Sequence, residues 1–265
     1  MAKPIMVLPD KTMIGFRLVS QKESAISLRV QAIFDTLARA RIMIAERGPS
    51  LTGTDEKFSV TERAYQIVRA KILAGDMQPG RFFTERKLAE DLSTSRTPLR
   101  TALTRLTSEG LLERAANGTV AVRQLPLEEL LQIMVIRRQL ESEAAALTAL
   151  KSATGSTDAL IAETRTLIAA PDVDLESFWL YDDKVHECIA QGSGMQVLAD
   201  LIRNMRDKSR MCHMVHLEPD FLAQAEEHMA ILIAIRDRDA SAAREAMILH
   251  IDHVRNRFVK WFTGG

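Results

Sequence analysis

From Leu127 almost to the end of the 265-residue chain, the sequence has a continuous helical pattern. Apolar residues recur every three or four positions, and glycine or proline separates the repeating segments. Aromatic residues, which favour strands, make up only 5% of the chain. Such a segment buries its apolar faces by packing helix on helix, so we expect an all-α bundle. The predicted helices are Leu127–Leu150, Thr157–Ala170, Leu175–Gln191, Met195–His216, Pro219–Arg238 and Ala240–Phe262.

The preceding 65 residues or so follow a different plan, in which three helices are followed by two short extended runs. The dipeptide Asn117-Gly118 between these runs is typical of a β-hairpin turn. This order predicts a winged helix-turn-helix, so the expected fold is mainly α with a small hairpin. Its elements are Ser59–Ala74, a helix that starts near Thr84, Ser95–Glu109, Leu111–Arg114 and Thr119–Val122.

The charge of the chain is divided unevenly, although its formal net charge is zero. Residues 57–123 hold 12 Lys/Arg and 7 Asp/Glu, a net charge of +5. Residues 124–265 hold 15 and 22, a net charge of −7, and residues 1–56 hold 8 and 6. A basic segment joined to an acidic one indicates that only the first binds a polyanion.

The third predicted helix has the side chains that a DNA-recognition helix needs. Its leucines face inward, whereas Arg96, Thr97 and Arg100 occupy exposed positions near its start. Arginine can bind a guanine edge with two hydrogen bonds or contact a phosphate. Arg86 can reach the DNA backbone, and Gly118 at the hairpin tip permits close approach to it.

Residues from about Ser59 to Arg123 resemble the GntR family of bacterial repressors. The resemblance implies that Arg86, Ser95, Arg96, Thr97, Arg100 and Gly118 contact DNA. One departure is Leu92-Ser93-Thr94, where relatives usually have a Gly-Val-type turn. The matching positions are Leu88-Ala89, Ser95 to Arg100, Ala102-Leu103, Leu106, Glu109-Gly110-Leu111 and Gly118.

All six histidines lie in the helical half. Asp182 and His186 are four residues apart and project from one helix face, while His228 and His250 lie on the last two predicted helices. Imidazole and carboxylate groups are good ligands for a divalent transition metal. By spacing alone, however, dispersed histidines on amphipathic helices are more often surface or satisfied core residues.

Residues from about Leu127 to Val254 resemble the FadR-type ligand-binding domain, abbreviated FCD. The resemblance implies a metal held by Asp182, His186, His228 and His250, with zinc, nickel and manganese as candidates. The segments that carry this resemblance are Arg137 to Glu141, Asp182 to His186, Glu227 to Ile231, Asp239 and His250.

Arginines in the same half are candidates for binding an anionic effector, since a guanidinium group matches a carboxylate. Arg137 is the first choice, and Arg203, Arg206 and Arg210 are further candidates. For each, the alternative is a solvated helix charge. His213, His216 and His253 are interpreted as surface or pocket-lining residues.

Residues 1–56 permit two interpretations. They could be a poorly ordered tail or the product of a start codon assigned too early, with Met43 as the alternative start. They could instead supply a helix over Glu23–Arg47 that packs on the dimer or contacts DNA. We therefore divide the chain into an extension (1–56), a DNA-binding domain (57–124) and an effector-binding and dimerisation domain (125–265).

The sequence predicts a transcription regulator that binds operator DNA as a homodimer and responds to a small organic acid. Two distant cysteines and the absence of a membrane-spanning or secretory segment predict a cytoplasmic protein. Two alternatives remain open: a metal-dependent hydrolase fused to a DNA-binding module, and a metal sensor. We do not expect an enzyme, because no nucleophile or separate general base accompanies the Asp/His set.

Overall fold

The computed structural model describes residues 59–151, 155–169, 174–216 and 220–263. The predictions for residues 1–56, and those for the side chains of His213 and His216, lie outside the described part. Within it, no helix has the length and apolar character required to cross a bilayer.

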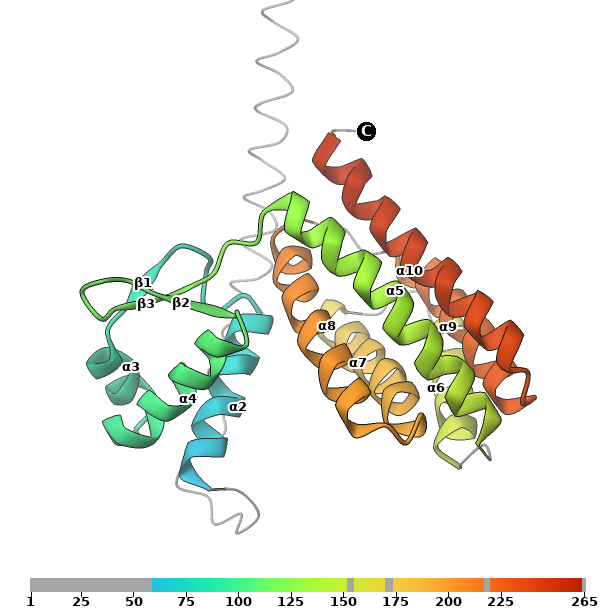
Figure 1. Ribbon diagram of the computed structural model, residues 1–265, viewed down its shortest axis with the longest axis horizontal. Coiled ribbons are helices and arrows are strands. Elements are labelled where there is room, and N and C mark those ends of the chain that lie inside the picture. The colour runs from blue at the N-terminus through green and yellow to red at the C-terminus, as the bar shows by residue number, and fades with distance from the viewer. Residues whose placement is uncertain (1–58, 152–154, 170–173, 217–219, 264–265) are drawn as a thin grey trace, which may run out of the picture. The chain divides into compact units, whose positions relative to one another are not determined.

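The N-terminal part is a winged helix-turn-helix (Figure 1). Its elements are α2 (Val60–Leu73), β1 (Phe82–Phe83), α3 (Glu85–Asp91), α4 (Arg96–Ser108), β2 (Leu112–Arg114) and β3 (Val120–Val122). Two helices start near the predicted positions and are capped there: the hydroxyl of Ser59 accepts from the amide of Glu62 at 3.1 Å, and that of Thr84 from the amide of Lys87 at 3.2 Å. The apolar core of this unit contains buried leucines from α4, namely Leu99, Leu103 and Leu106.

The small sheet has one strand more than the predicted hairpin. Its order is β1-β3-β2, and both neighbouring pairs are antiparallel. The added strand β1 is only two residues long and pairs Phe82 with Ala121. A two-residue strand has no periodicity to detect, which explains why the sequence pattern did not reveal it.

The C-terminal part consists of six helices that agree closely with the predicted ranges. They are α5 (Leu127–Leu150), α6 (Gly155–Ala169), α7 (Leu175–Gly192), α8 (Gln196–His216), α9 (Phe221–Arg236) and α10 (Ala240–Thr263). The predicted fold class is confirmed: mainly α, with a winged helix-turn-helix followed by a helical bundle.

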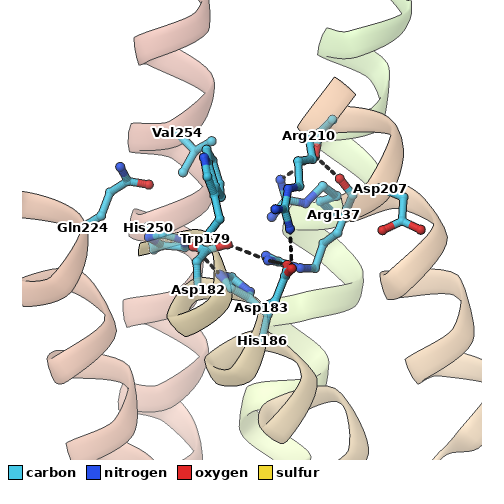
Figure 2. Close-up of a pocket in the computed structure, with 12 residues that line it drawn as sticks. Arg137, Trp179, Asp182, Asp183, His186, Asp207, Arg210, Gln224, His250 and Val254 are labelled. Atoms are coloured by element: carbon cyan, nitrogen blue, oxygen red, sulfur yellow. Dashed lines mark hydrogen bonds and ion pairs between the residues drawn. The ribbon is translucent and has the colours of Figure 1, made fainter. Parts of the chain in front are cut away.

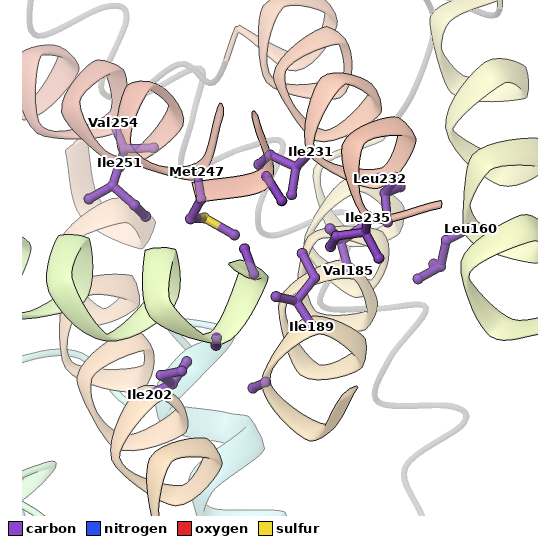
Figure 3. Packing of buried hydrophobic residues seen from close by; sticks show 14 of the residues in the cluster. Leu160, Val185, Ile189, Ile202, Ile231, Leu232, Ile235, Met247, Ile251 and Val254 are labelled. Carbon is purple, nitrogen blue, oxygen red and sulfur yellow. The ribbon is translucent and has the colours of Figure 1, made fainter. Parts of the chain in front are cut away.

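Helix α10 packs along α5 and α9 in this bundle (Figure 1). Apolar residues from facing helices, such as Ile189, Ile231 and Met247, interdigitate in its core (Figure 3). This packing brings α7, α9 and α10 together, and these are the helices that hold the predicted metal ligands. The position of the polar site therefore follows from the burial of the apolar stripes beside it.

The turn between α3 and α4 contains a residue in a strained conformation. Ser93 has φ 48°, in the left-handed region that an L-residue adopts only at a cost, and its side chain is exposed. This is the segment where the sequence departs from the Gly-containing turn of the family. The helix-turn-helix geometry is thus retained with a serine at the position where glycine would be unstrained.

We expect Ser93→Gly to raise the free energy of unfolding by about 0.5–1 kcal/mol. A non-glycine residue in this conformation costs roughly 1–2 kcal/mol, and the greater freedom of glycine in the unfolded chain offsets part of the gain. Urea unfolding followed by circular dichroism measures the difference. Ser93→Ala is the control, because it keeps the Cβ and should bring no gain. Equal stability of Ser93→Gly and the wild type would contradict the account of this turn.

Candidate functional site

The start of α4 is exposed and carries three of the residues expected to contact DNA. Ser95 is the N-cap residue, and its side chain makes no capping hydrogen bond. Arg96 and Thr97 follow in the first turn, and both are exposed. The first amides of a helix have no partner within it, so this end attracts phosphate oxygens.

Four of the six expected DNA-contacting residues line one concave surface of the winged helix-turn-helix. Arg86, Arg96, Arg100 and Gly118 lie on it, together with Arg114 from β2. We call this surface the arginine face. The arrangement of four guanidinium groups on one face suits a polyanion, and their planar forks suit guanine edges and phosphates.

Gly118 forms the tip of the hairpin that borders the arginine face. Its φ is +80°, and a Cβ placed on it would meet no atom within 4 Å. The side-chain oxygen of Asn117 accepts from the amide of Thr119 at 3.0 Å, which fixes the turn. Glycine is therefore required here by its backbone conformation, and the open space beyond it allows another molecule to approach.

A second polar site lies inside the helical bundle, where three histidines converge. His186 of α7, His228 of α9 and His250 of α10 each offer a ring nitrogen, and these atoms lie within 4.8 Å of one another. All three side chains are buried. Asp182 is close to this set: its Oδ1 is 3.8 Å from His186 Nε2 and 3.5 Å from His228 Nε2. Figure 2 shows Asp182, His186 and His250 around the pocket.

Two glutamates orient the histidine rings from behind. His186 Nδ1 lies 2.5 Å from Glu141 Oε2, and His250 Nδ1 lies 2.7 Å from Glu227 Oε2. A carboxylate that accepts from Nδ1–H leaves Nε2 as the ring's lone-pair donor. This carboxylate–imidazole arrangement is the usual support of a metal-binding histidine.

The chemical state of the imidazoles also fits a cation. His186 Nε2 and both ring nitrogens of His228 are buried without a hydrogen-bond partner among the described residues, which is rare in folded proteins. Burial lowers the pKa of His186 to about 4 and the pKa of His228 well below its ordinary value. Both rings are thus neutral near pH 7, the form that binds transition metals. The residues present fit a divalent metal ion.

The carboxylate of Asp182 is shared between the histidines and an arginine. Arg206 Nη2 of α8 donates to Asp182 Oδ2 at 2.6 Å, while Oδ1 is the oxygen that lies near the imidazoles. Burial acts to raise the pKa of Asp182, but the positive charge of Arg206 and the hydrogen bond from it outweigh burial, and the pKa is lowered. Asp182 therefore stays ionised and presents one free oxygen to the histidines.

Guanidinium groups border the small cavity beside this centre. Arg137 is buried and donates to Glu141 at 2.7 Å and to Ser209 at 2.9 Å. Arg206 and Arg210 both pair with Asp183. The cavity has a volume of about 20 Å³, room for about one water-sized species.

The structure thus brings the predicted metal ligands together and places Arg137 at the adjacent cavity. Of the other arginine candidates, Arg206 and Arg210 line the cavity. Arg203 instead pairs with Glu187 and Asp200 on a half-exposed surface. Sequence reasoning missed Glu141 and Glu227 as partners of the histidines. The two glutamates lie 45 and 23 residues from the histidines they contact, so no local spacing signalled these pairs.

Helix α8 also contacts the winged helix-turn-helix. Asp207 accepts two hydrogen bonds from Arg69 of α2, at 2.5 and 2.6 Å. Asn204 donates to the backbone oxygen of Glu109 at 3.2 Å, and Met211 packs into the apolar core of the DNA-binding unit. One helix therefore contacts both the buried centre and the DNA-binding unit.

Two family models match separate segments of the chain. Residues 60–122 match the family described as bacterial regulatory proteins, gntR family, and residues 132–253 match the FCD domain. The HTH-type transcriptional repressor RspR of Escherichia coli is 25% identical over 200 residues, which cover 74% of this chain and 87% of RspR. A putative L-lactate dehydrogenase operon regulatory protein of E. coli is 29% identical over 221 residues, covering 74% and 83%.

Solved structures share the fold. E. coli McbR/YncC superposes with a TM-score of 0.66 at 20% identity, over 77% of this chain and 99% of that one. A putative GntR regulator from Rhodococcus sp. RHA1 gives 0.61 at 19% identity, over 76% and 98%. The chain therefore belongs to the GntR family of transcription regulators and carries an FCD domain.

Proposed function

We propose that a small organic acid controls the operator affinity of this regulator by binding beside a metal in residues 125–265, while residues 57–124 bind the DNA. We also propose that it acts as a homodimer, because one chain supplies one recognition helix and a pseudo-palindromic operator has two half-sites. The observation that carries the proposal is the position of two consecutive residues, Arg206 and Asp207, on α8.

These two residues tie the buried centre to the DNA-binding unit. Arg206 binds Asp182 beside the histidines, and Asp207 binds Arg69 of α2. A shift of α8 that changes one contact alters the other, because a helix moves as a stiff element. A ligand that favours one position of α8 then changes the operator affinity, and the operator changes the ligand affinity by the same factor.

An anion is the ligand that the cavity lining favours. Arg137, Arg206 and Arg210 border the cavity, and a carboxylate can replace Asp183, which now pairs with both Arg206 and Arg210. The volume of about 20 Å³ is too small for an organic acid unless such side chains move. Binding thus requires the rearrangement near α8 that the mechanism needs.

His186, His228, His250 and Asp182 are the residues that would hold a divalent ion such as zinc, nickel or manganese. When bound, the ion would supply a Lewis-acidic centre that can accept an effector carboxylate as a further ligand. Glu141 and Glu227 keep the imidazoles of His186 and His250 oriented toward this centre.

The hydrolase alternative gains no support from the hydroxyl group that lines the described cavity. This hydroxyl group, that of Ser209, accepts from Arg137 and donates to the backbone oxygen of Arg206, both at 2.9 Å. A serine nucleophile instead requires an adjacent base that takes its proton. We therefore propose a regulatory role for this site.

Arg96→Ala should weaken binding to the cognate operator by about 1–3 kcal/mol if Arg96 contacts a base. The operator is first selected from random duplex DNA with the wild-type protein, and gel-shift titration then gives Kd. Arg165→Ala, which removes an exposed arginine from α6, is the control and should leave Kd unchanged. Unchanged operator affinity in Arg96→Ala would contradict the assignment of α4 as the recognition helix.

The metal site is tested by elemental analysis of purified protein. The wild type should contain about one divalent metal per chain, and the His228→Ala/His250→Ala variant should contain almost none, because two of four ligands are lost. His253→Ala is the matched control: its side chain contacts the same Glu227 but is half-exposed, and metal content should persist. Equal metal content in the double variant and the wild type would exclude this site.

Effector control is tested by measuring operator Kd with a series of mono-, di- and tricarboxylates. At least one should change Kd roughly 5- to 150-fold, the usual range of allosteric coupling. Asp207→Asn should reduce this change because it weakens the contact with Arg69. Asp200→Asn, an exposed site on the same helix, should retain the full change. A full response in Asp207→Asn would contradict coupling through this ion pair, and no response to any carboxylate would contradict the effector class.

A further inference from the structure

The arginine face contains a carboxylate that DNA binding alone does not explain. Glu85, the first residue of α3, lines this face among its four arginines. Its side chain is only 10% exposed, so it is held within the surface and is not a mobile surface charge. A negative charge beside a phosphate-binding surface opposes association with DNA, and this residue therefore requires a separate explanation.

Each carboxylate oxygen of Glu85 is used by a different arginine. Arg100 Nε of the recognition helix donates to Oε2 at 2.9 Å, and Arg114 Nη1 of strand β2 donates to Oε1 at 2.9 Å. These contacts connect three elements: α3, α4 and the hairpin. Hydrogen bonds from Arg114 and Arg100 lower the pKa of Glu85, so it remains ionised at neutral pH.

The geometry leaves much of each guanidinium free. A guanidinium has five N–H donors, and the contact from Arg100 uses only the one at Nε. The Nη groups of Arg100 have no partner among the described residues, so they are available for a bidentate contact with a guanine edge. A side chain that is already fixed loses less entropy on binding than one that samples many rotamers.

We propose that Glu85 is a specificity-determining positioning residue, which holds Arg100 and Arg114 in place so that they discriminate between DNA sequences. Its charge has a second effect, since it offsets part of the attraction of these two arginines for any phosphate. Glu85 thus lowers the affinity for arbitrary DNA and preserves the affinity for the operator. The inference assumes that the arginine face binds DNA, which Arg96→Ala tests separately.

Glu85→Gln separates this role from a structural one. The amide keeps the size of the side chain but offers one acceptor oxygen, so it cannot hold both arginines. We expect the ratio of Kd for scrambled DNA to Kd for the selected operator to fall about fivefold or more. We also expect unchanged or tighter binding to scrambled DNA. Its salt dependence should steepen by about 0.9 in the log–log slope if one released arginine gains a phosphate.

Glu85→Asp keeps the charge but shortens the side chain by one methylene, so it tests position without changing net charge. It should lower the same ratio while the salt dependence for scrambled DNA stays that of the wild type. It also provides a test if Glu85→Gln fails to fold, which thermal unfolding detects. Asp91→Asn is the charge-matched control, because Asp91 lies on the same helix, is exposed and pairs with Lys87. Its specificity ratio should equal that of the wild type.

Three results would overturn the proposal: an unchanged ratio in folded Glu85→Gln, a parallel loss of both affinities, or an equal fall of the ratio in Asp91→Asn. If Arg96→Ala weakens operator binding while both Glu85 variants keep the wild-type ratio, the arginine face stands and only the inference about Glu85 fails. If Arg96→Ala has no effect, the face itself is wrongly assigned.

Discussion

The burial of four polar groups inside an apolar bundle is the constraint on which the rest of this structure depends. His186, His228, His250 and Asp182 are taken out of water, and an unpartnered polar group in such a place costs about 1–3 kcal/mol. Glu141 and Glu227 satisfy two of the rings, but Nε2 of His186 and both ring nitrogens of His228 have no hydrogen-bond partner among the described residues. The bundle thus maintains a preformed, electron-rich centre, which a cation would stabilise.

Helix α8 links this centre to the DNA-binding unit. Its sequence places an arginine and an aspartate side by side, and their contacts lie in two different units: Asp182 for Arg206 and Arg69 for Asp207. The arginine face also depends on ion pairs between separate elements. There a half-buried carboxylate, Glu85, pairs with two arginines from separate elements. In both places, ion pairs between elements hold the groups that we propose bind an external ligand.

Much of this architecture could be predicted from the sequence, because it depends on local patterns. Apolar periodicity located α5 to α10 within a few residues, and the predicted start at Ser59 is one residue from the observed start of α2 at Val60. The partners of functional side chains could not be predicted in this way. Glu141 lies 45 residues before His186, and Arg114 lies 29 residues after Glu85. Only the packed fold brings them together, and no periodicity encodes such pairs.

We propose that the histidine centre holds a metal to which a carboxylate effector gains access. X-ray absorption at the zinc edge tests it directly, on zinc-loaded protein alone and with a carboxylate that changes operator affinity. We expect three imidazole nitrogens at about 2.0–2.1 Å from the zinc in both samples, and an oxygen shell around the zinc that changes when the carboxylate is added. Fewer than three imidazole ligands, or an oxygen shell that the carboxylate leaves unaltered, would contradict it.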